Sequence, residues 1–214
     1  MLVFDIGSNK GQFTNACLAG LDDCKIVMVE PNPEIIDTLN SIYGSNPSIV
    51  DVLHAAATTT AGDNLEFRPC IVDNRMSTVS KFWLEDSRFS TENFGPPVSV
   101  ETTTLDLLVE KYGKPQLIKI DVEGHEYEVI KGLSSKEGKL CFEWTEEQYD
   151  LINLSIEHLV SLGYTQFGYV DSVSDGSSDY LREPDNYVFE WGDSSFHQLV
   201  QPSRKRKWGM IWAK

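Results

Sequence analysis

The sequence predicts an α/β protein built on a mostly parallel seven-stranded sheet that closes with an antiparallel hairpin. Short apolar, β-branched segments alternate with segments of helical periodicity as far as residue 162, which is the pattern of a parallel sheet covered by helices on both faces. Beyond Gly163 only strand-like segments remain. With 214 residues, 41% of them hydrophobic, the chain has the size and composition of one globular domain. We therefore expect residues 1–214 to form a single domain.

The first half of the chain is expected to contribute five strands and two helices. The strands are residues 2–6, 25–30, 49–56, 65–70 and 77–82. The helices are residues 11–21 and 33–43. Pro33 stands in the first turn of the second helix and Gly44 follows its end, as is usual for helix boundaries. The last two strands interrupt the alternation and are interpreted as additions to the main sheet.

The second half is expected to contribute three helices and six strands. The helices are residues 105–112, 125–132 and 146–162. The strands are residues 98–103, 116–122, 139–143, 164–170, 187–191 and 208–213. Residues 116–122, QLIKIDV, are almost continuously apolar, which is typical of a central strand buried on both faces. The last strands, joined by loops such as the Ser/Asp/Gly-rich segment 171–179, predict the antiparallel closing hairpin.

Charge and cysteine content exclude several classes of function. Eighteen Lys and Arg residues against thirty-three Asp and Glu residues give a net charge of −15, which repels nucleic acid and anionic membrane surfaces. The composition is too polar for membrane insertion, and the N-terminus lacks the features of a signal peptide. The four cysteines show no CxxC pairing, so we expect reduced thiols and a soluble, cytoplasmic protein. The oligomeric state stays open.

A glycine-rich turn follows the first strand. The segment FDIGSNKGQF places Gly7 and Gly11 where a strand turns into a helix, and this allows a ligand to approach the backbone without meeting a Cβ atom. Glu30 ends the next strand, where a carboxylate can accept both hydroxyls of a ribose. The pair indicates an adenosine-containing cofactor, although such a turn can also serve tight packing alone.

The residues of this turn favour S-adenosylmethionine over a dinucleotide. Asn9 stands where a dinucleotide-binding turn has its middle glycine, and its side chain would crowd a pyrophosphate. Asp5 would be an unfavourable anion beside phosphates but can face an amino group, directly or through water. Hydride transfer, as in a nucleotide-sugar epimerase or dehydrogenase, is the less favoured alternative.

A second turn, after the strand at 116–122, is rich in ionisable groups. The segment IDVEGHE puts Asp121, Glu123 and His125 at the carboxyl end of a buried strand, which is where open α/β sheets bind their ligands. Glu126 is interpreted as a residue that favours the N-terminus of the following helix and is left out of the site. His125 has the alternative interpretation of a surface residue at that helix N-terminus.

Four motifs together resemble the FkbM family of S-adenosylmethionine-dependent methyltransferases: DIGSNKGQFT, VEPNP, TTLDLL and LIKIDVEGHEYEVIKGL. The resemblance extends from residue 2 to about residue 145 and implies a Rossmann-like class I methyltransferase sandwich. It implies O-methylation of a sugar, a glycan or a natural-product hydroxyl. The residues it assigns to the methionine part of the cofactor are Asp5, Gly7, Ser8, Asn9, Gly11 and Phe13. Those it assigns to the ribose and adenine are Glu30, Pro31 and Asn32. The chain begins directly on the first strand, so both a minimal protein and an excised domain stay open.

Methyl transfer to oxygen requires a positioned acceptor and a group that takes its proton. The candidates are Asp121, Glu123, His125 and Glu143, with Glu123 and His125 ranked first; Asp121 and the loop residue Ser77 are also assigned to the cofactor. Asp121, Glu123 and Glu143 could supply oxygen ligands, but without a recognisable linear motif we predict no metal. Residues 73–97 and 171–203 are expected to shape an acceptor pocket that suits a carbohydrate. A non-catalytic binding module stays as a further alternative.

Overall fold

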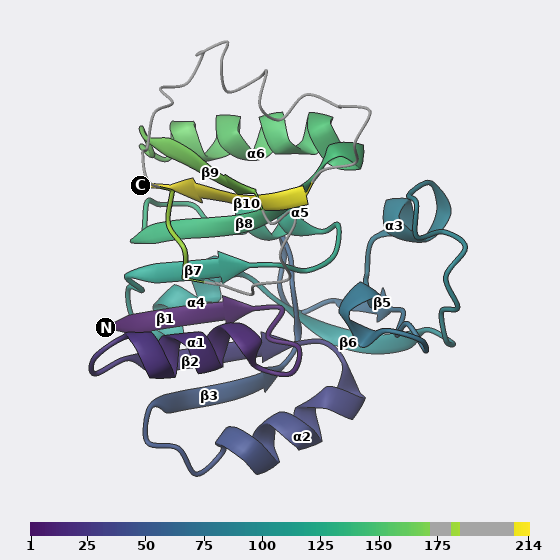
Figure 1. The fold of residues 1–214 in the computed structure, drawn as a ribbon, viewed down its shortest axis with the longest axis horizontal. Coiled ribbons are helices and arrows are strands. Elements are labelled where there is room, and N and C mark those ends of the chain that lie inside the picture. Colours follow the sequence, from purple (N-terminus) through teal and green to yellow (C-terminus); the bar gives the residue numbers. More distant parts are fainter. Residues whose placement is uncertain (172–180, 185–207) are drawn as a thin grey trace.

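The computed structural model describes residues 1–171, 181–184 and 208–214. A seven-stranded sheet with the order β3-β2-β1-β7-β8-β10-β9 forms the centre (Figure 1). Its strands are β1 (Leu2–Ile6), β2 (Lys25–Glu30), β3 (Ile49–His54), β7 (Leu117–Ile120), β8 (Lys139–Thr145), β9 (Phe167–Asp171) and β10 (Trp208–Ala213). The first five are parallel, and β10 is antiparallel to both β8 and β9. The predicted Rossmann-like α/β fold with a closing hairpin is confirmed.

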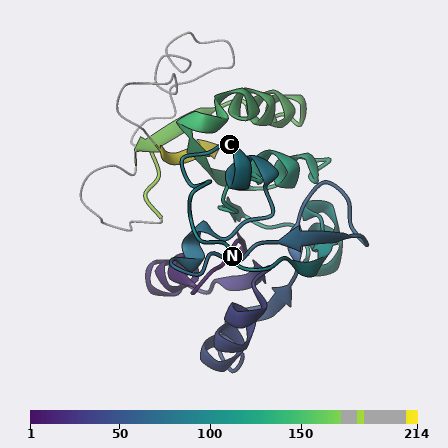
Figure 2. The ribbon, with the colours of Figure 1, turned by 90° about the vertical axis from the view of Figure 1, so that its right-hand side faces the viewer.

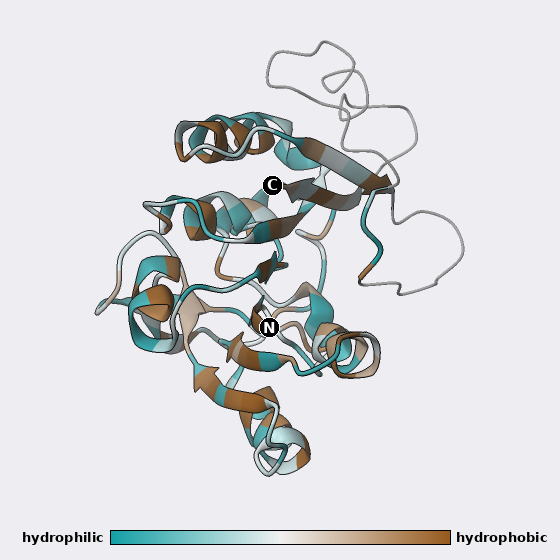
Figure 3. Ribbon diagram, turned by 90° about the vertical axis from the view of Figure 1, so that its left-hand side faces the viewer, coloured by the Kyte–Doolittle hydropathy of each residue, from teal (hydrophilic) through white to brown (hydrophobic). Residues whose placement is uncertain are grey.

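Helices cover both faces of this sheet because alternate strand residues point to opposite sides. Val3 packs with α1 (Gln12–Gly20) and α2 (Pro33–Tyr43), whereas its neighbour Phe4 belongs to the cluster on the other face. That other face is covered by α4 (Leu105–Tyr112), α5 (Glu126–Lys131) and α6 (Tyr149–Ser161). Apolar residues accordingly concentrate in the strands between the two helical layers (Figure 3).

A smaller sheet lies beyond the carboxyl ends of the parallel strands (Figures 1 and 2). It has the order β4-β6-β5, formed by β4 (Ala56–Ala57), β5 (Asn64–Phe67) and β6 (Val98–Thr103). The 3-10 helix η1 (Asn74–Met76) and the helix α3 (Lys81–Glu85) lie in the connection between β5 and β6. Since ligands bind at the carboxyl ends of such strands, this added layer is placed to form one wall of a site.

The prediction of a strand at 77–82 is wrong. Thr78 makes an isolated bridge with Arg68, and α3 then begins where the Ser80 hydroxyl accepts a hydrogen bond from the Trp83 N–H. A serine N-cap favours a helix, and burial of Trp83 holds it in place. The neighbouring prediction, 65–70, is met only by β5, with isolated bridges at Arg68 and Cys70.

Other boundaries shift by a few residues. The expected strand at 49–56 divides after His54 into β3 and β4, which belong to different sheets. The expected helix at 146–162 begins as the 3-10 helix η2 (Glu146–Gln148) before α6. The strand expected at 187–191 lies outside the described residues. All four cysteines are buried and free, and among the described helices none is long and apolar enough to cross a bilayer.

Candidate active site

A cavity of about 350 Å³ opens at the carboxyl ends of β1, β2, β7 and β8, facing the smaller sheet. Its size is in the range of small-molecule sites. It brings together most of the site residues predicted from the sequence: Gly7, Ser8, Asn9, Phe13, Glu30, Pro31, Ser77, Asp121, Glu123, His125 and Glu143. Three predicted residues, Asp5, Gly11 and Asn32, lie outside its lining.

Gly7 is required where the turn after β1 meets the turn after β7. Its φ is +75°, and a Cβ atom built there would lie 1.8 Å from the Asp121 carbonyl oxygen. Gly11, at φ +81°, instead contacts the Tyr43 ring of α2, and the Tyr43 hydroxyl donates to the Gly11 carbonyl at 3.2 Å. Gly7 therefore brings two turns together at the cavity, and Gly11 packs α1 against α2.

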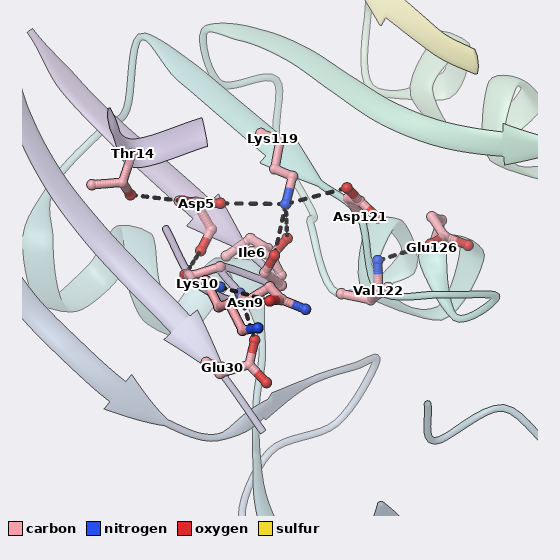
Figure 4. Close-up of polar contacts among 12 residues, drawn as sticks. Asp5, Ile6, Asn9, Lys10, Thr14, Glu30, Lys119, Asp121, Val122 and Glu126 are labelled. Carbon is pink, nitrogen blue, oxygen red and sulfur yellow. Dashed lines mark hydrogen bonds and ion pairs between the residues drawn. The ribbon is translucent and has the colours of Figure 1, made fainter. Parts of the chain in front are cut away.

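Glu30 connects the turn after β1 to the start of α2. One of its carboxylate oxygens accepts the Asn9 N–H at 2.7 Å (Figure 4). The other accepts the Asn32 N–H at 2.8 Å. Asn32 in turn caps α2 by accepting the Glu34 N–H. Burial raises the pKa of Glu30 to about 7 despite these two hydrogen bonds. The carboxylate is thus held rigidly at the edge of the cavity.

Asp5 lies behind the cavity in an internal ion pair. It is fully buried, accepts a hydrogen bond from the Thr14 hydroxyl at 2.7 Å, and lies 3.4 Å from the Lys119 ammonium (Figure 4). Lys119 also donates to the Gly7 carbonyl at 2.7 Å and lies 3.6 Å from the Asp121 carboxylate. Asp5 is thus engaged by contacts inside the protein, and its expected contact with a cofactor amino group stays a prediction.

Lys119 is a site residue that the sequence analysis did not single out. It is 4% exposed and lines the cavity. The neighbouring carboxylates, Asp121 first and then Asp5, raise its pKa against the effect of burial. The available signal was a single cation inside an otherwise apolar strand, because a lysine is rarely buried without a partner.

The backbone of the turn at 121–126 is held from three sides. The Thr78 hydroxyl donates to the Glu123 carbonyl at 2.6 Å, and the Gln148 amide donates to the Gly124 carbonyl at 2.9 Å. The buried Glu126 carboxylate accepts the N–H of Val122 at 2.9 Å and that of Gly124 at 3.1 Å. Glu126 therefore positions the turn from behind.

These contacts hold Glu123 in an unusual conformation. Its φ is +54°, a region that residues with a Cβ atom rarely adopt. Such a conformation persists only where the surroundings over-determine it. Gly124 follows at φ +92°, and a Cβ atom there would lie 2.7 Å from the Trp83 ring.

Three carboxylates meet in front of this turn. Asp121, Glu123 and Glu143 each offer an oxygen that lies within 4.8 Å of the other two. Burial, and then repulsion from neighbouring carboxylates, raises the pKa of Glu123 and of Glu143 well above the usual value. Asp121 and Glu123 of one turn and Glu143 of the next strand thus share one wall of the cavity.

His125 lies beside these carboxylates in the cavity lining. One ring nitrogen is 2.9 Å from the Thr58 hydroxyl, and burial lowers the pKa of the imidazole. A neutral imidazole is able to take up a proton near pH 7. Ser77 lines the cavity too, but its hydroxyl accepts the Cys70 N–H at 2.9 Å and so also supports the loop.

The opposite wall comes from residues 73–97, which were expected from the sequence to shape a pocket; the other segment expected to do so, 171–203, lies mostly outside the described residues. The lining residues of this wall are Asn74, Arg75, Met76, Trp83, Arg88 and Phe89. They follow β5, and only folding brings them over the sheet. Tyr127 and Lys131 have a Tyr-x-x-x-Lys spacing, but these α5 residues contact each other and lie outside the lining.

Comparisons with known proteins agree with this arrangement. The Methyltransferase FkbM domain matches residues 5–171. The chain is 33% identical over 137 residues to the hexuronic acid methyltransferase AglP of Haloferax volcanii, which covers 63% of this chain and 50% of that protein. It is 30% identical over 163 residues to the methyltransferase sdnD of Sordaria araneosa, which covers 64% of this chain and 62% of that protein. The chain thus matches only half to about three-fifths of the length of these relatives.

Among solved structures, the chain is similar to precorrin-6y C5,15-methyltransferase from Geobacter metallireducens GS-15. The TM-score is 0.45 at 15% identity, with coverage of 100% of this chain and 80% of that chain. The domain match spans most of the chain and includes both turns of the cavity. This chain belongs to the FkbM methyltransferase family.

Proposed function

We propose that the chain is an S-adenosylmethionine-dependent O-methyltransferase that methylates a hydroxyl of a sugar or glycan. The observation that carries the proposal is a single cavity onto which the glycine turn, Glu30 and the acidic turn all open. Membership of the FkbM methyltransferase family supports the reaction class. Similarity to a protein named as a hexuronic acid methyltransferase supports a sugar acceptor.

The residues around the turn after β1 fit the proposed cofactor. Gly7 allows the turn after β1 to lie directly against the turn after β7 at the cavity, and Glu30 presents a rigid carboxylate suited to ribose hydroxyls. Asn9, held at φ +44° beside Glu30, offers an amide where a pyrophosphate would need open space. When bound, S-adenosylmethionine supplies a methyl group activated by its sulfonium. The protein then has to orient an acceptor oxygen and take its proton.

The acidic wall and His125 are suited to that second task. A carboxylate whose pKa is raised by burial is a stronger base than one in water, and Glu123 is in this class. His125 is neutral through burial and is the second candidate. Phe89 and Arg88 line the facing wall, where Arg88 also pairs with Glu147 at 2.9 Å, and aromatic and guanidinium groups are suited to carbohydrate rings and acidic sugars. An acceptor with a non-sugar hydroxyl is the competing proposal.

The same observations support our remaining proposals about the whole chain. Both sheets contribute residues to one cavity, which supports a single domain over residues 1–214. The free cysteines support a reducing, cytoplasmic environment. The net charge of −15 supports an acceptor other than nucleic acid.

The first test is calorimetric titration with S-adenosylmethionine and, separately, NAD. We expect binding of the methyl donor alone, weakened about tenfold or more in Glu30→Gln because a carboxylate that accepts ribose hydroxyls is lost. The matched control is Glu34→Gln, an exposed carboxylate in the first turn of the following helix, α2, which should bind as the parent does. Binding of NAD instead would overturn the cofactor.

The second test screens acceptors by mass spectrometry. Oligosaccharides that contain hexuronic acids are compared with neutral sugars and with non-sugar alcohols in the presence of the methyl donor. We expect methylated product from the acidic sugars. Product formed only from non-sugar alcohols would replace the acceptor class, and no product from any of them would leave a binding module.

A further inference from the structure

We propose that Asp121, Glu123 and Glu143 bind a hard divalent cation, of the Mg²⁺ class, at the ends of β7 and β8, and that this cation holds the acceptor oxygen. The cation site stands on the geometry alone. Its role toward the acceptor rests on the methyl transfer proposed above. No motif in the sequence indicates the site, because its ligands come from two strands that only the sheet brings together.

The first observation is three oxygens that match the ligand spacing of a cation. They lie within 4.8 Å of one another. Three oxygens spaced evenly around one ion are separated by the square root of three times the bond length, which is about 4.0–4.5 Å for Ca²⁺ and about 3.5–3.6 Å for Mg²⁺. The 4.8 Å limit is close to these separations, so small side-chain rotations bring the three oxygens to the spacing of either ion.

The second observation is that the protein itself does not satisfy this charge. Among the described residues, the Glu123 and Glu143 carboxylates receive no hydrogen bond and no ion pair, although both line the cavity. The nearby cation, Lys119, lies 3.6 Å from Asp121 but is shared with the buried Asp5. One ammonium thus faces four carboxylates, and buried charges are normally paired or bound to a metal.

The third observation is independent of the acidic cluster. Thr145 stands two residues after Glu143 on β8, so both side chains lie on the same face of the strand. Thr145 is only 3% exposed, lines the cavity, and has a buried hydroxyl oxygen with no hydrogen-bond partner in the described part of the chain. Such groups are rare in folded proteins. A cation, or a water bound to one, would satisfy it.

The donor set determines the class of ion. All three side chains are carboxylates, and the adjacent free group is a hydroxyl. Oxygen donors without thiolate or imidazole favour Mg²⁺, Ca²⁺ or Mn²⁺ over Zn²⁺ or Cu²⁺. Three ligands leave several coordination positions of such an ion open toward the cavity, where an acceptor with adjacent hydroxyls can bind.

A cation at this place also changes which residue acts as the base. With Glu123 and Glu143 engaged as ligands, His125, which lines the same cavity, is the candidate base among the described residues. A bound cation favours loss of the proton from a coordinated oxygen. In the balanced step, His125 takes the hydroxyl proton, the oxygen forms a bond to the methyl carbon, and the carbon–sulfur bond breaks to leave a neutral thioether.

The experiment is a titration of the EDTA-treated full chain with Mn²⁺, followed by the electron paramagnetic resonance signal of free Mn²⁺, without methyl donor or acceptor. We expect one site per chain with a Kd of about 10–100 μM, from which Mg²⁺ and Ca²⁺ displace Mn²⁺. Glu123→Gln and Glu143→Gln should each weaken binding by about tenfold or more. Glu110→Gln, an exposed carboxylate on α4, is the matched control and should bind as the parent does.

Thr145→Val is a second variant that tests the cation site if Glu123→Gln or Glu143→Gln fails to fold. It has nearly the same shape and removes only the unpartnered hydroxyl, and we expect weaker Mn²⁺ binding at an unchanged melting temperature. The site would be overturned if the parent showed no saturable Mn²⁺ binding below about 1 mM. It would also be overturned if Glu123→Gln and Glu143→Gln both bound Mn²⁺ as tightly as the parent does. Mn²⁺ binding without S-adenosylmethionine binding keeps the site and discards the methyl transfer. Methyl transfer that is undiminished in EDTA discards the cation's role toward the acceptor.

Discussion

The turns after β1 and β7 lie side by side on the central strands, yet the carboxylates around the two turns have opposite environments. Around the first turn, Asp5 is paired with Thr14 and Lys119, and Glu30 accepts two backbone N–H groups. Around the second, the backbone is held by Thr78, Gln148 and Glu126, while the side chains of Glu123 and Glu143 meet in the cavity with no hydrogen-bond or ion-pair partner among the residues that the structure describes.

This difference separates recognition from reactivity. A turn whose polar groups are already satisfied presents a rigid shape, so it binds a ligand without reorganisation. A turn with a fixed backbone and unpaired carboxylates is preorganised to react with a bound ligand, because these carboxylates gain the most interaction energy when a partner binds. Both turns contain a residue with a Cβ atom at positive φ, Asn9 at +44° and Glu123 at +54°, so both conformations are imposed by their surroundings.

Lys119 connects the two turns, and its removal is expected to have the largest effect. Lys119→Met leaves Asp5 fully buried without its cation and removes hydrogen bonds to the carbonyls of Ile6 and Gly7. We expect a loss of about 3–5 kcal/mol in the free energy of unfolding, measured by urea denaturation. The double variant with Asp5→Asn should recover part of it. A single variant as stable as the parent would show that the two turns are independent.

Gly7 is the point of contact between the turns, and its substitution tests their close approach. Gly7→Ala places a Cβ atom 1.8 Å from the Asp121 carbonyl at a φ of +75°, and we expect a loss of about 2–4 kcal/mol from overpacking and backbone strain. Gly62→Ala is the matched control, since its φ is +83° but nothing lies within 4 Å of the added atom. It should cost only about 1 kcal/mol. Equal losses in both variants, compared by urea denaturation, would mean that backbone strain alone decides the effect.

The same isosteric change should have opposite signs in the two turns. Glu30→Gln disturbs two backbone hydrogen bonds and should destabilise by about 1–2 kcal/mol. Glu143→Gln breaks no hydrogen bond within the described residues and removes a charge that burial and then neighbouring carboxylates disfavour, so in EDTA at pH 8 it should stabilise by about 1 kcal/mol. The Glu143 pKa is raised in the folded protein, so this carboxyl favours the fold fully below its unfolded pKa and loses that contribution as pH rises. The gain in Glu143→Gln should therefore vanish near pH 4 in thermal melts. A stability gain in Glu143→Gln that did not change with pH would show that the charge of Glu143 is not its cause.

Much of the fold was predictable because it depends on local patterns. The boundaries of β1, β2, α2, β6, α4 and β10 agree with those expected. Alternation of apolar residues, an Asn cap before Pro33 and a Thr cap before Leu105 act within a few residues along the chain. The strand expected at 77–82 failed because the Ser80 cap and the burial of Trp83 favour a helix there.

For the site, the sequence by itself determined the two turns, since a glycine-rich turn and a carboxylate-rich turn are consequences of short segments. Only the tertiary structure decided which carboxylates are satisfied. Lys119 reaches Gly7 across 112 positions of sequence, and Glu143 joins Asp121 and Glu123 because β7 and β8 are adjacent. Charge pairing depends on distances of a few ångströms between segments that are remote in sequence, and residue type and spacing along the chain carry no record of those distances.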